Sequence, residues 1–543
     1  MNKIRTFLNE YKFHIFSFAA IFFLVFFTYH HVSKFGFIGF DDTMIIMKKI
    51  SDMDSVAKIK NFLKQPVFDE ADSLYYRPFL NLSFAIDTII SGGEMGFYHF
   101  SNMIIHIIAV FLLFVFLLCL NYSKPISLIV SLIFSVHPVL VSSVAWIPGR
   151  NDSLLAIFVF LFFIFFIKNI DTGKISYAFL AALSLLAVAF TKETVIIMPV
   201  IFFLYLFLYH KPGKKSILTA FAITVFAFSI YILLRAHTIS QGNGNLDFGK
   251  MALNLFNSLG AYFWYLRIIF FLKKIYLYPR LPITVHDIAI GLILLIFLAA
   301  IAYFFRKNMN FKRIIFGLAW YFLFLAPTIV TKTAAYLNHR LYLPIIGILI
   351  ILIEIAVIAP LSAGFKIKKI LFTLAAIIIV LFAFLSYKSS FYYENHSSFW
   401  PNAYKQNPLS FTAALETAAH YKKSGDLENA EKYLFEALNL SKGNPEAKVL
   451  MAIGDFYFGK NEDAKAFEYY AKAEEKSKYN EYIYLGLSRH YEMKRDKEKA
   501  LAELERGLAI IPKSKLLAKR VKILKDEIPD DSYVIVMKAI NGR

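Results

Sequence analysis

The sequence predicts an all-α membrane protein with about eleven transmembrane helices, followed by a smaller domain of helical repeats. Hydrophobic residues make up 58% of the 543 positions, and aromatic residues make up 17%. This composition is typical of proteins that cross the membrane many times. Beyond residue 400 the chain becomes charged and rich in alanine, which indicates a second domain. We therefore expect a transmembrane domain over 1–395 and a repeat domain over 396–543.

Apolar runs that cross, or nearly cross, a bilayer recur from residue 13 to about residue 387. The predicted spans are 13–33, 100–120, 126–143, 153–168, 175–191, 193–210, 216–235, 285–305, 312–330, 341–360 and 367–387. The segment 251–273 is also apolar. We interpret it as an interfacial or re-entrant helix, because a crossing there would reverse every later loop.

Basic residues give the expected orientation. The formal net charge is +20, and most of the excess lies in short turns between apolar runs, a pattern that favours cytoplasmic membrane loops over a nucleic-acid partner. The clusters near residues 3–12, 211–215, 306–313 and 366–369 fall on one side of an eleven-span chain. We therefore expect a plasma (inner) membrane protein with a cytoplasmic N-terminus and an extracytoplasmic repeat domain.

The repeats have a period of about 34 residues. Small residues recur at Ala430, Ala464 and Ala500, and again at Ala437, Ala471 and Gly507, while tyrosines recur at Tyr421, Tyr457 and Tyr491. Gly425 is expected to turn the first helix pair. The pattern over 402–515 resembles about three tetratricopeptide repeats, whose stacked helices form a concave surface for a protein partner. A purely structural cap is the alternative.

Polar residues gather at the predicted outer ends of the spans. Two adjacent acids, Asp41 and Asp42, follow the first span, where charge near a membrane is costly and often functional. A solvated loop is the alternative. Three further residues share one face of the second span, by spacing: His99, Asn102 and His106. Packing of that face with satisfied imidazoles is the alternative there.

The remaining polar residues include four cations on the predicted outer side. They are Arg77, Arg150, Lys192 and Arg340, accompanied by His137, Asp152, Glu193 and Tyr342. Outer cations oppose the usual charge bias and so need an anion, for which a lipid-linked phosphate is the simplest candidate. A carboxylate beside a sugar with a phosphate leaving group suits glycosyl transfer, with the acid as base. A structural anion site is the alternative.

The order of these motifs resembles that of the transmembrane and tetratricopeptide repeat-containing O-mannosyltransferases and their bacterial relatives, in the GT-C superfamily. The motifs are the acidic pair, Arg-Pro, Gly-x-x-His-x-x-Asn-x-x-x-His, His-Pro, Arg-x-Asp, Lys-Glu and Arg-x-Tyr-x-Pro. The resemblance implies a GT-C-like bundle and inverting transfer of a mannose-like sugar from a polyprenyl-phosphate donor to a protein Ser/Thr hydroxyl. It also implies that one of Asp41 and Asp42 is the base and the other a metal ligand or orienting group. Arg150, Lys192 and Arg340 are then candidate phosphate contacts.

Two departures leave the sugar and the acceptor open. The family often has a His and a Glu after His-Pro, where this chain has Leu140 and Ser142, and often an acid before the final Arg, where this chain has His339. Two rival functions compete with the transferase. One is a non-enzymatic membrane-anchored repeat scaffold for envelope proteins. The other is a flippase of lipid-linked sugars, which predicts polar residues near span midpoints instead of outer ends.

Overall fold

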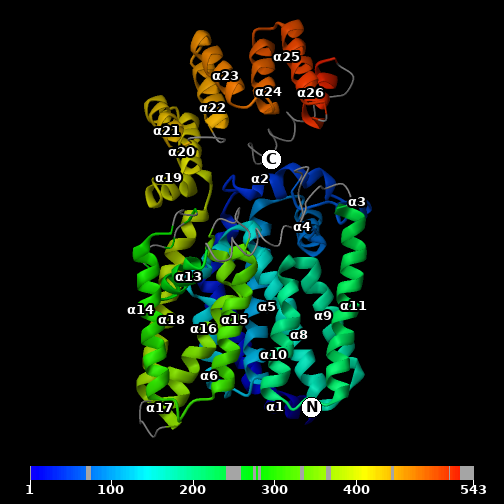
Figure 1. The fold of residues 1–543 in the computed structure, drawn as a ribbon, viewed down its shortest axis with the longest axis vertical. Coiled ribbons are helices and arrows are strands. Elements are labelled where there is room, and N and C mark those ends of the chain that lie inside the picture. The colour runs from blue at the N-terminus through cyan, green and yellow to red at the C-terminus, as the bar shows by residue number, and fades with distance from the viewer. Residues whose placement is uncertain are drawn as a thin grey trace. The chain divides into compact units, whose positions relative to one another are not determined.

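The chain folds into two compact units, residues 1–399 and residues 400–543 (Figure 1). The structure, a computed structural model, describes residues 2–68, 75–239, 258–272, 275, 277–278, 283–330, 336–362, 368–441, 446–512 and 514–525. All secondary structure within these ranges is helical. The expectation of an all-α polytopic membrane protein is confirmed.

The first unit contains the membrane helices. Among the described residues, seven helical stretches are long and apolar enough to cross a membrane. They contain α1 (Asn2–Tyr29), α5 (Met95–Cys119), α8 (Arg150–Thr172), α11 (Lys214–Ile239), α14 (Val285–Phe304), α15 (Phe311–Val330) and α18 (Lys368–Ser390). Three more predicted spans coincide with shorter apolar helices. These are α9 (Ile175–Thr191), η5 (Glu193–Ile197) with α10 (Met198–Tyr209), and α16 (Pro344–Leu352) with η7 (Ile353–Ile358).

The remaining predicted span, 126–143, is broken in the middle. It consists of α6 (Lys124–Ser135), η3 (Pro138–Leu140) and α7 (Val141–Ala145), with a bend of 54° between its two halves. The break falls at His137–Pro138 because proline disfavours the helical conformation of the residue before it, and His137 is extended, with ψ of 122°. The bend leads the chain into η4 (Ile147–Gly149) at the start of α8.

Short helices cover the end of the bundle that contains Asp42. They are η1 (His30–Lys34), α2 (Asp41–Ile45), η2 (Met47–Asp52), α3 (Val56–Phe62), α4 (Pro78–Ser91), α13 (Gly260–Phe270), η6 (Asn338–Leu341) and η8 (Phe391–Tyr393). The part of 251–273 that the structure describes as helix is α13. Eleven residues at 1.5 Å each give about 16 Å, well short of a bilayer core.

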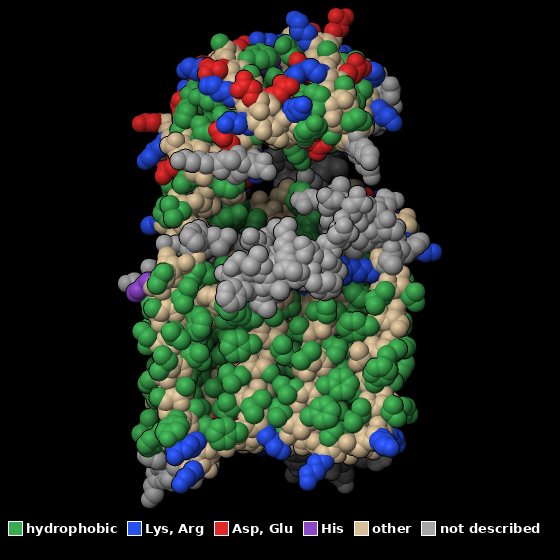
Figure 2. Space-filling view, in the orientation of Figure 1, with side chains coloured by type: hydrophobic (Ala, Val, Ile, Leu, Met, Phe, Trp, Pro, Cys, Tyr) green, Lys and Arg blue, Asp and Glu red, His purple; other side chains and the backbone are tan. Residues whose placement is uncertain are grey.

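The opposite end of the first unit carries the basic turns. Figure 2 shows a belt of hydrophobic side chains bounded at that end by Lys and Arg. Arg313 there bonds the carbonyl of Leu120 at 3.0 Å and the buried carboxylate of Glu354 at 3.0 Å, which ties the ends of α5, α15 and η7 together. The short helix α17 (Ala359–Ser362) lies at the same end (Figure 1).

The second unit stacks helices in antiparallel pairs. After α19 (His396–Gln406), which runs across the boundary between units, come α20 (Phe411–Ser424), α21 (Leu427–Leu440), α22 (Glu446–Gly459), α23 (Asp463–Lys476), α24 (Glu481–Met493), α25 (Lys497–Ile510) and α26 (Lys515–Leu524). Gly425 ends α20 with a φ of +83°, so its predicted turn is confirmed.

The predicted small-residue register of the second repeat is wrong by two positions. Ala464 and Ala471 are exposed, and the buried alanines are Ala466 and Ala473. The steps between equivalent alanines are therefore 36 residues from Ala430 and then 34 residues to Ala500. Tyr421, Tyr457 and Tyr491 have the same spacing of 36 and 34, so the tyrosines carried the correct register.

Candidate functional site

Asp42 is a buried acid with one unpartnered oxygen. It lies in the first turn of α2 and is 1% exposed. Its Oδ2 accepts a hydrogen bond from the backbone N–H of Ile38 at 2.8 Å, whereas its Oδ1 is buried without a partner in the described part of the chain. Burial raises the pKa of Asp42 to about 7, and the neighbouring charge of Asp41 adds to the effect. A carboxyl with this pKa can exchange a proton near neutral pH.

The loop before Asp42 is held by backbone contacts. His99 Nε2 donates to the Gly36 carbonyl at 3.2 Å, and the Gly36 N–H donates to the Glu394 carbonyl at 2.8 Å. Gly39 adopts a φ of +75°, and a Cβ there would lie 2.9 Å from the His396 ring. The loop therefore passes between α5 and the chain that follows α18, and glycine is needed where it turns.

Trp146 joins this loop to the polar residues of η6. Its ring stacks on Phe40 with 5.4 Å between centroids, and its centroid lies 5.1 Å from that of the His339 ring. Its indole N–H has no hydrogen-bond partner among the described residues and lies close enough to Asp42 to favour the charged carboxylate. The acid and the segment that contains Arg340 thus both lie next to one buried indole.

Two ion pairs lie where α4, α8, α9 and η5 meet. Arg77 binds Glu193 through two nitrogens, with an Nη2–Oε2 distance of 2.7 Å. Lys192 Nζ binds Asp152 Oδ1 at 2.6 Å. His339 Nε2 lies 3.8 Å from Asp152 Oδ2, and burial lowers the pKa of His339 to about 3, so this imidazole is neutral. Two of the predicted outer cations therefore pair with two acids of the same predicted set.

Arg340 differs from the other predicted cations. It is half-buried, and its guanidinium forms no ion pair or hydrogen bond with any residue that the structure describes. Its charge nevertheless acts on Asp152, Lys192 and His339. With Arg77 and Lys192 it makes three cations against the two carboxylates of Asp152 and Glu193, an excess of one positive charge. An anion beside Arg340 would balance this excess.

Arg150 does not face this cluster. It is fully buried, and its Nη1 binds Asp87 at 2.6 Å while its Nε donates to Asn102 Oδ1 at 2.6 Å. Its other N–H groups donate to the carbonyls of Ser83 and Tyr98 and to the Ser101 hydroxyl. All five donors are used within the protein. In this structure Arg150 positions α4, α5 and α8, in place of the expected phosphate contact.

The polar face of α5 serves the same positioning role. Asn102 Nδ2 lies within 3.1–3.2 Å of the carbonyls of Val144, Trp146 and Ile147. His106 bonds the Tyr342 hydroxyl at 2.7 Å and the Ser135 carbonyl at 2.9 Å. These contacts match the packed-face alternative. They fix the loop that carries Trp146 and the residues that follow Arg340.

His137 and Asp41 are the remaining predicted site residues. His137 Nδ1 accepts from the Val139 N–H at 3.3 Å and so caps η3 after the break. Asp41 is partly exposed beside Asp42. No group of three or more His, Cys, Asp or Glu among the described residues could hold a metal ion.

Three residues that contribute to the site were not chosen as candidates from the sequence. Asp87 is a lone acid in the short apolar helix α4, and an ionisable residue in such a helix is a signal that could have found it. Trp146 and Tyr265 were not chosen because aromatic residues are common here. Tyr265 donates to the Leu337 carbonyl at 3.2 Å and so holds the segment before Arg340.

No family model matches the chain. Over parts of its length it is similar to curated animal proteins. It is 30% identical over 139 residues to human Protein O-mannosyl-transferase TMTC3, which covers 25% of this chain and 15% of the relative. It is 27% identical over 114 residues to mouse Protein O-mannosyl-transferase TMTC1, covering 21% and 12%. It is 26% identical over 178 residues to Drosophila melanogaster Protein O-mannosyl-transferase Tmtc1, covering 32% and 20%. The matches therefore span a fifth or less of each relative's length.

Proposed function

We propose that this chain is an integral membrane glycosyltransferase of the GT-C type. It would transfer a mannose-like sugar from a polyprenyl-phosphate donor to a hydroxyl of a protein acceptor outside the cytoplasm. The observation that carries the proposal is Asp42, a buried carboxyl with one oxygen unpartnered among the described residues, next to the Trp146 indole that also adjoins the segment of Arg340. The partial similarity to animal proteins named O-mannosyl-transferases supports the same reaction class.

The chemistry follows from these two groups. The acceptor oxygen attacks the anomeric carbon of the sugar and gives its proton to the Asp42 carboxylate. The bond from that carbon to the phosphate oxygen breaks, and the polyprenyl phosphate leaves with the electron pair. Arg340 stabilises the charge on the departing phosphate, and the excess positive charge of the cluster adds to this effect. A single displacement inverts the anomeric carbon.

Asp42 is the better base of the acidic pair. Its Oδ1 has no partner among the residues that the structure describes, and its pKa of about 7 allows both protonation states at neutral pH. Asp41 then orients the acceptor or holds a divalent metal. Transfer measured with EDTA, and again after Mg²⁺ or Mn²⁺ is restored, separates these two roles of Asp41.

The deciding experiment compares two acids of the same outer segment. Membranes with Asp42→Asn are assayed for transfer of radiolabelled mannose from polyprenyl-phosphate mannose to a Ser/Thr peptide. Asp54→Asn is the matched control, because Asp54 is exposed and pairs with the exposed Lys58 at 2.9 Å. Loss of transfer in Asp42→Asn alone supports the proposal. Equal transfer in both would favour a non-enzymatic scaffold.

The second unit is proposed to bind the protein acceptor. Paired helices with small residues at their contacts, such as Ala430 on α21 and Ala466 on α23, are typical of tetratricopeptide repeats. Gly507 also packs tightly, since a Cβ there would lie 2.6 Å from the Tyr484 ring. A chain that ends at residue 399 should retain transfer to a short peptide and lose transfer to a folded acceptor.

A further inference from the structure

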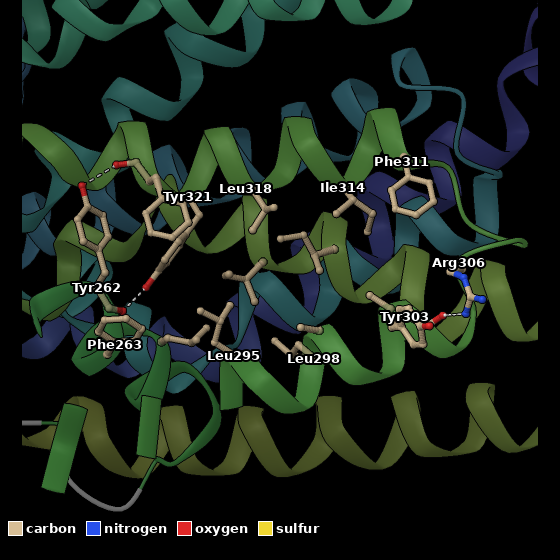
Figure 3. A pocket seen from close by; sticks show the side chains of 16 residues that line it. Tyr262, Phe263, Leu295, Leu298, Tyr303, Arg306, Phe311, Ile314, Leu318 and Tyr321 are labelled. Atoms are coloured by element: carbon tan, nitrogen blue, oxygen red, sulfur yellow. Dashed lines mark hydrogen bonds between the residues drawn. The ribbon is translucent and has the colours of Figure 1, made fainter. Parts of the chain in front are cut away.

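An apolar groove lies between α14 and α15, away from the acid and the ion pairs. It has a volume of about 340 Å³, within the range of ligand cavities. Figure 3 shows its length, from Tyr262 and Phe263 at one end to Arg306 and Phe311 at the other. The nine steps of α14 from Leu295 to Phe304 span about 14 Å of helix. The groove is thus long, narrow and almost wholly hydrophobic.

The groove exists because α14 packs on α13 and scarcely touches α15. Gly291 allows the first contact, since a Cβ there would lie 2.1 Å from the Phe263 carbonyl. On the other side α15 packs on α16, where a Cβ on Gly347 would lie 2.3 Å from the Gly317 carbonyl. Each wall is therefore fixed to a different neighbour, and the space between the walls stays open.

The two ends of the groove differ in polarity. At the end near α13, the Tyr321 hydroxyl donates to the Tyr262 carbonyl at 2.6 Å, and the Tyr262 hydroxyl donates to the Phe322 carbonyl at 3.1 Å. Both phenol donors are used, so this end offers no free polar donor or charge. Arg340 does not line the groove.

At the other end Arg306 offers an available charge. Its guanidinium lies 4.2 Å from the Tyr303 ring centroid and donates once, to the Tyr303 carbonyl at 3.1 Å. It has no carboxylate partner among the described residues, whereas the nearby Arg313 is paired with Glu354 at 3.0 Å. A long apolar groove with one unpaired guanidinium at its mouth matches a lipid with an anionic headgroup.

We propose that this groove binds an anionic phospholipid, with one acyl chain between α14 and α15 and the phosphate on Arg306. The headgroup then belongs to the leaflet at the end of the bundle opposite Asp42. The lipid fills a space that packing leaves open and joins α14 to α15. This site is independent of the proposed transferase reaction.

The test uses the full-length protein, stripped of lipid and offered equal amounts of dioleoyl phosphatidylglycerol and dioleoyl phosphatidylcholine. Native mass spectrometry measures the lipid retained. We expect about a fivefold preference for phosphatidylglycerol, the effect of one basic side chain near a lipid surface. Arg306→Gln should abolish the preference. Lys307→Gln, which removes an exposed adjacent charge that does not line the groove, should keep it.

A second variant tests the chain position. Ala302→Phe narrows the groove and should lower the retention of both lipids. The proposal fails if the wild type shows no preference, if Arg306→Gln keeps the preference, or if Ala302→Phe retains phosphatidylglycerol at the wild-type level. It also fails if the purified protein carries a polyprenyl phosphate that Ala302→Phe displaces, because the groove then belongs to the sugar donor.

Discussion

At the scale of single residues, the pKa of Asp42 gives the clearest prediction. A base must be deprotonated, so transfer should rise with pH through about 7 in the wild type. Loss of a general base typically costs about 10²–10⁴ in rate, so Asp42→Asn should fall by that factor and lose the pH dependence. A steady rate between pH 5.5 and pH 8.5 in the wild type would contradict the assignment.

The raised pKa of Asp42 also predicts how Asp42→Asn changes stability, and this distinguishes loss of catalysis from misfolding. Because burial raises the pKa of Asp42, the folded state holds this proton more tightly than the unfolded chain. The group's contribution to the free energy of unfolding is therefore largest below the unfolded pKa and declines as pH rises through about 7. We expect Asp42→Asn to unfold at no lower temperature than the wild type at pH 8. A much lower melting temperature would attribute its inactivity to misfolding.

Arg150 and Arg340 were both candidate phosphate contacts from the sequence, but their substitutions should have different effects on stability and on transfer. Arg150→Gln breaks a fully buried pair with Asp87 and should cost about 3–5 kcal/mol of stability, which thermal unfolding in detergent measures. Arg340→Gln removes no ion pair with a described residue. It should leave the melting temperature unchanged while transfer falls roughly tenfold to a hundredfold, the worth of a hydrogen bond to a charged group. A lower melting temperature for Arg340→Gln, with stability unchanged in Arg150→Gln, would contradict both assignments.

At the scale of elements, Gly149 tests how the loop of Trp146 is positioned. A Cβ there would lie 2.1 Å from the Ser142 carbonyl, so Gly149→Ala must shift η4 and the Trp146 indole that adjoins Asp42 and His339. We expect lower transfer and a lower melting temperature. Gly213→Ala is the matched control, because nothing lies within 4 Å of its Cβ and its φ is not positive. Unchanged transfer in Gly149→Ala would show that the position of Trp146 is unimportant.

Elements also show what the sequence can predict. The spans follow from apolar runs, but 126–143 was expected as one unbroken span, so the 54° break at His137–Pro138 needed the structure, although proline chemistry explains it. Which cation is paired could not be predicted. Arg150 meets Asp87 across 63 positions, and Arg77 meets Glu193 across 116, and no local rule relates such distant residues. The predicted register of the second repeat was wrong because alanine is common on both the buried and the exposed faces of these helices.

At the scale of the whole molecule, the chain enters and leaves the first unit at opposite ends of the helical bundle. The first unit ends near α2, because His31 Nε2 bonds the Ser390 hydroxyl at 2.7 Å and Gly36 bonds the Glu394 carbonyl. The chain therefore leaves the bundle at the end that contains Asp42, and the N-terminus of α1 lies at the other end. An odd number of membrane crossings likewise puts the N-terminus and the exit of the chain at opposite ends of the bundle. We therefore predict that Asp42 and the second unit lie on the same side of the membrane.

This relation can be tested by labelling single cysteines in a Cys119→Ser background with a membrane-impermeant maleimide. Val56→Cys lies at the Asp42 end and Ser424→Cys lies in the second unit, and both positions are exposed. Gly213→Cys lies in the turn before α11, at the opposite end. With basic turns facing the cytoplasm, Val56→Cys and Ser424→Cys should react in intact cells and Gly213→Cys only after permeabilisation. Labelling of Gly213→Cys alone in intact cells would invert the orientation and place Asp42 on the cytoplasmic side. Different labelling of Val56→Cys and Ser424→Cys would overturn the shared side itself, and with it the proposal that the second unit presents acceptors to Asp42.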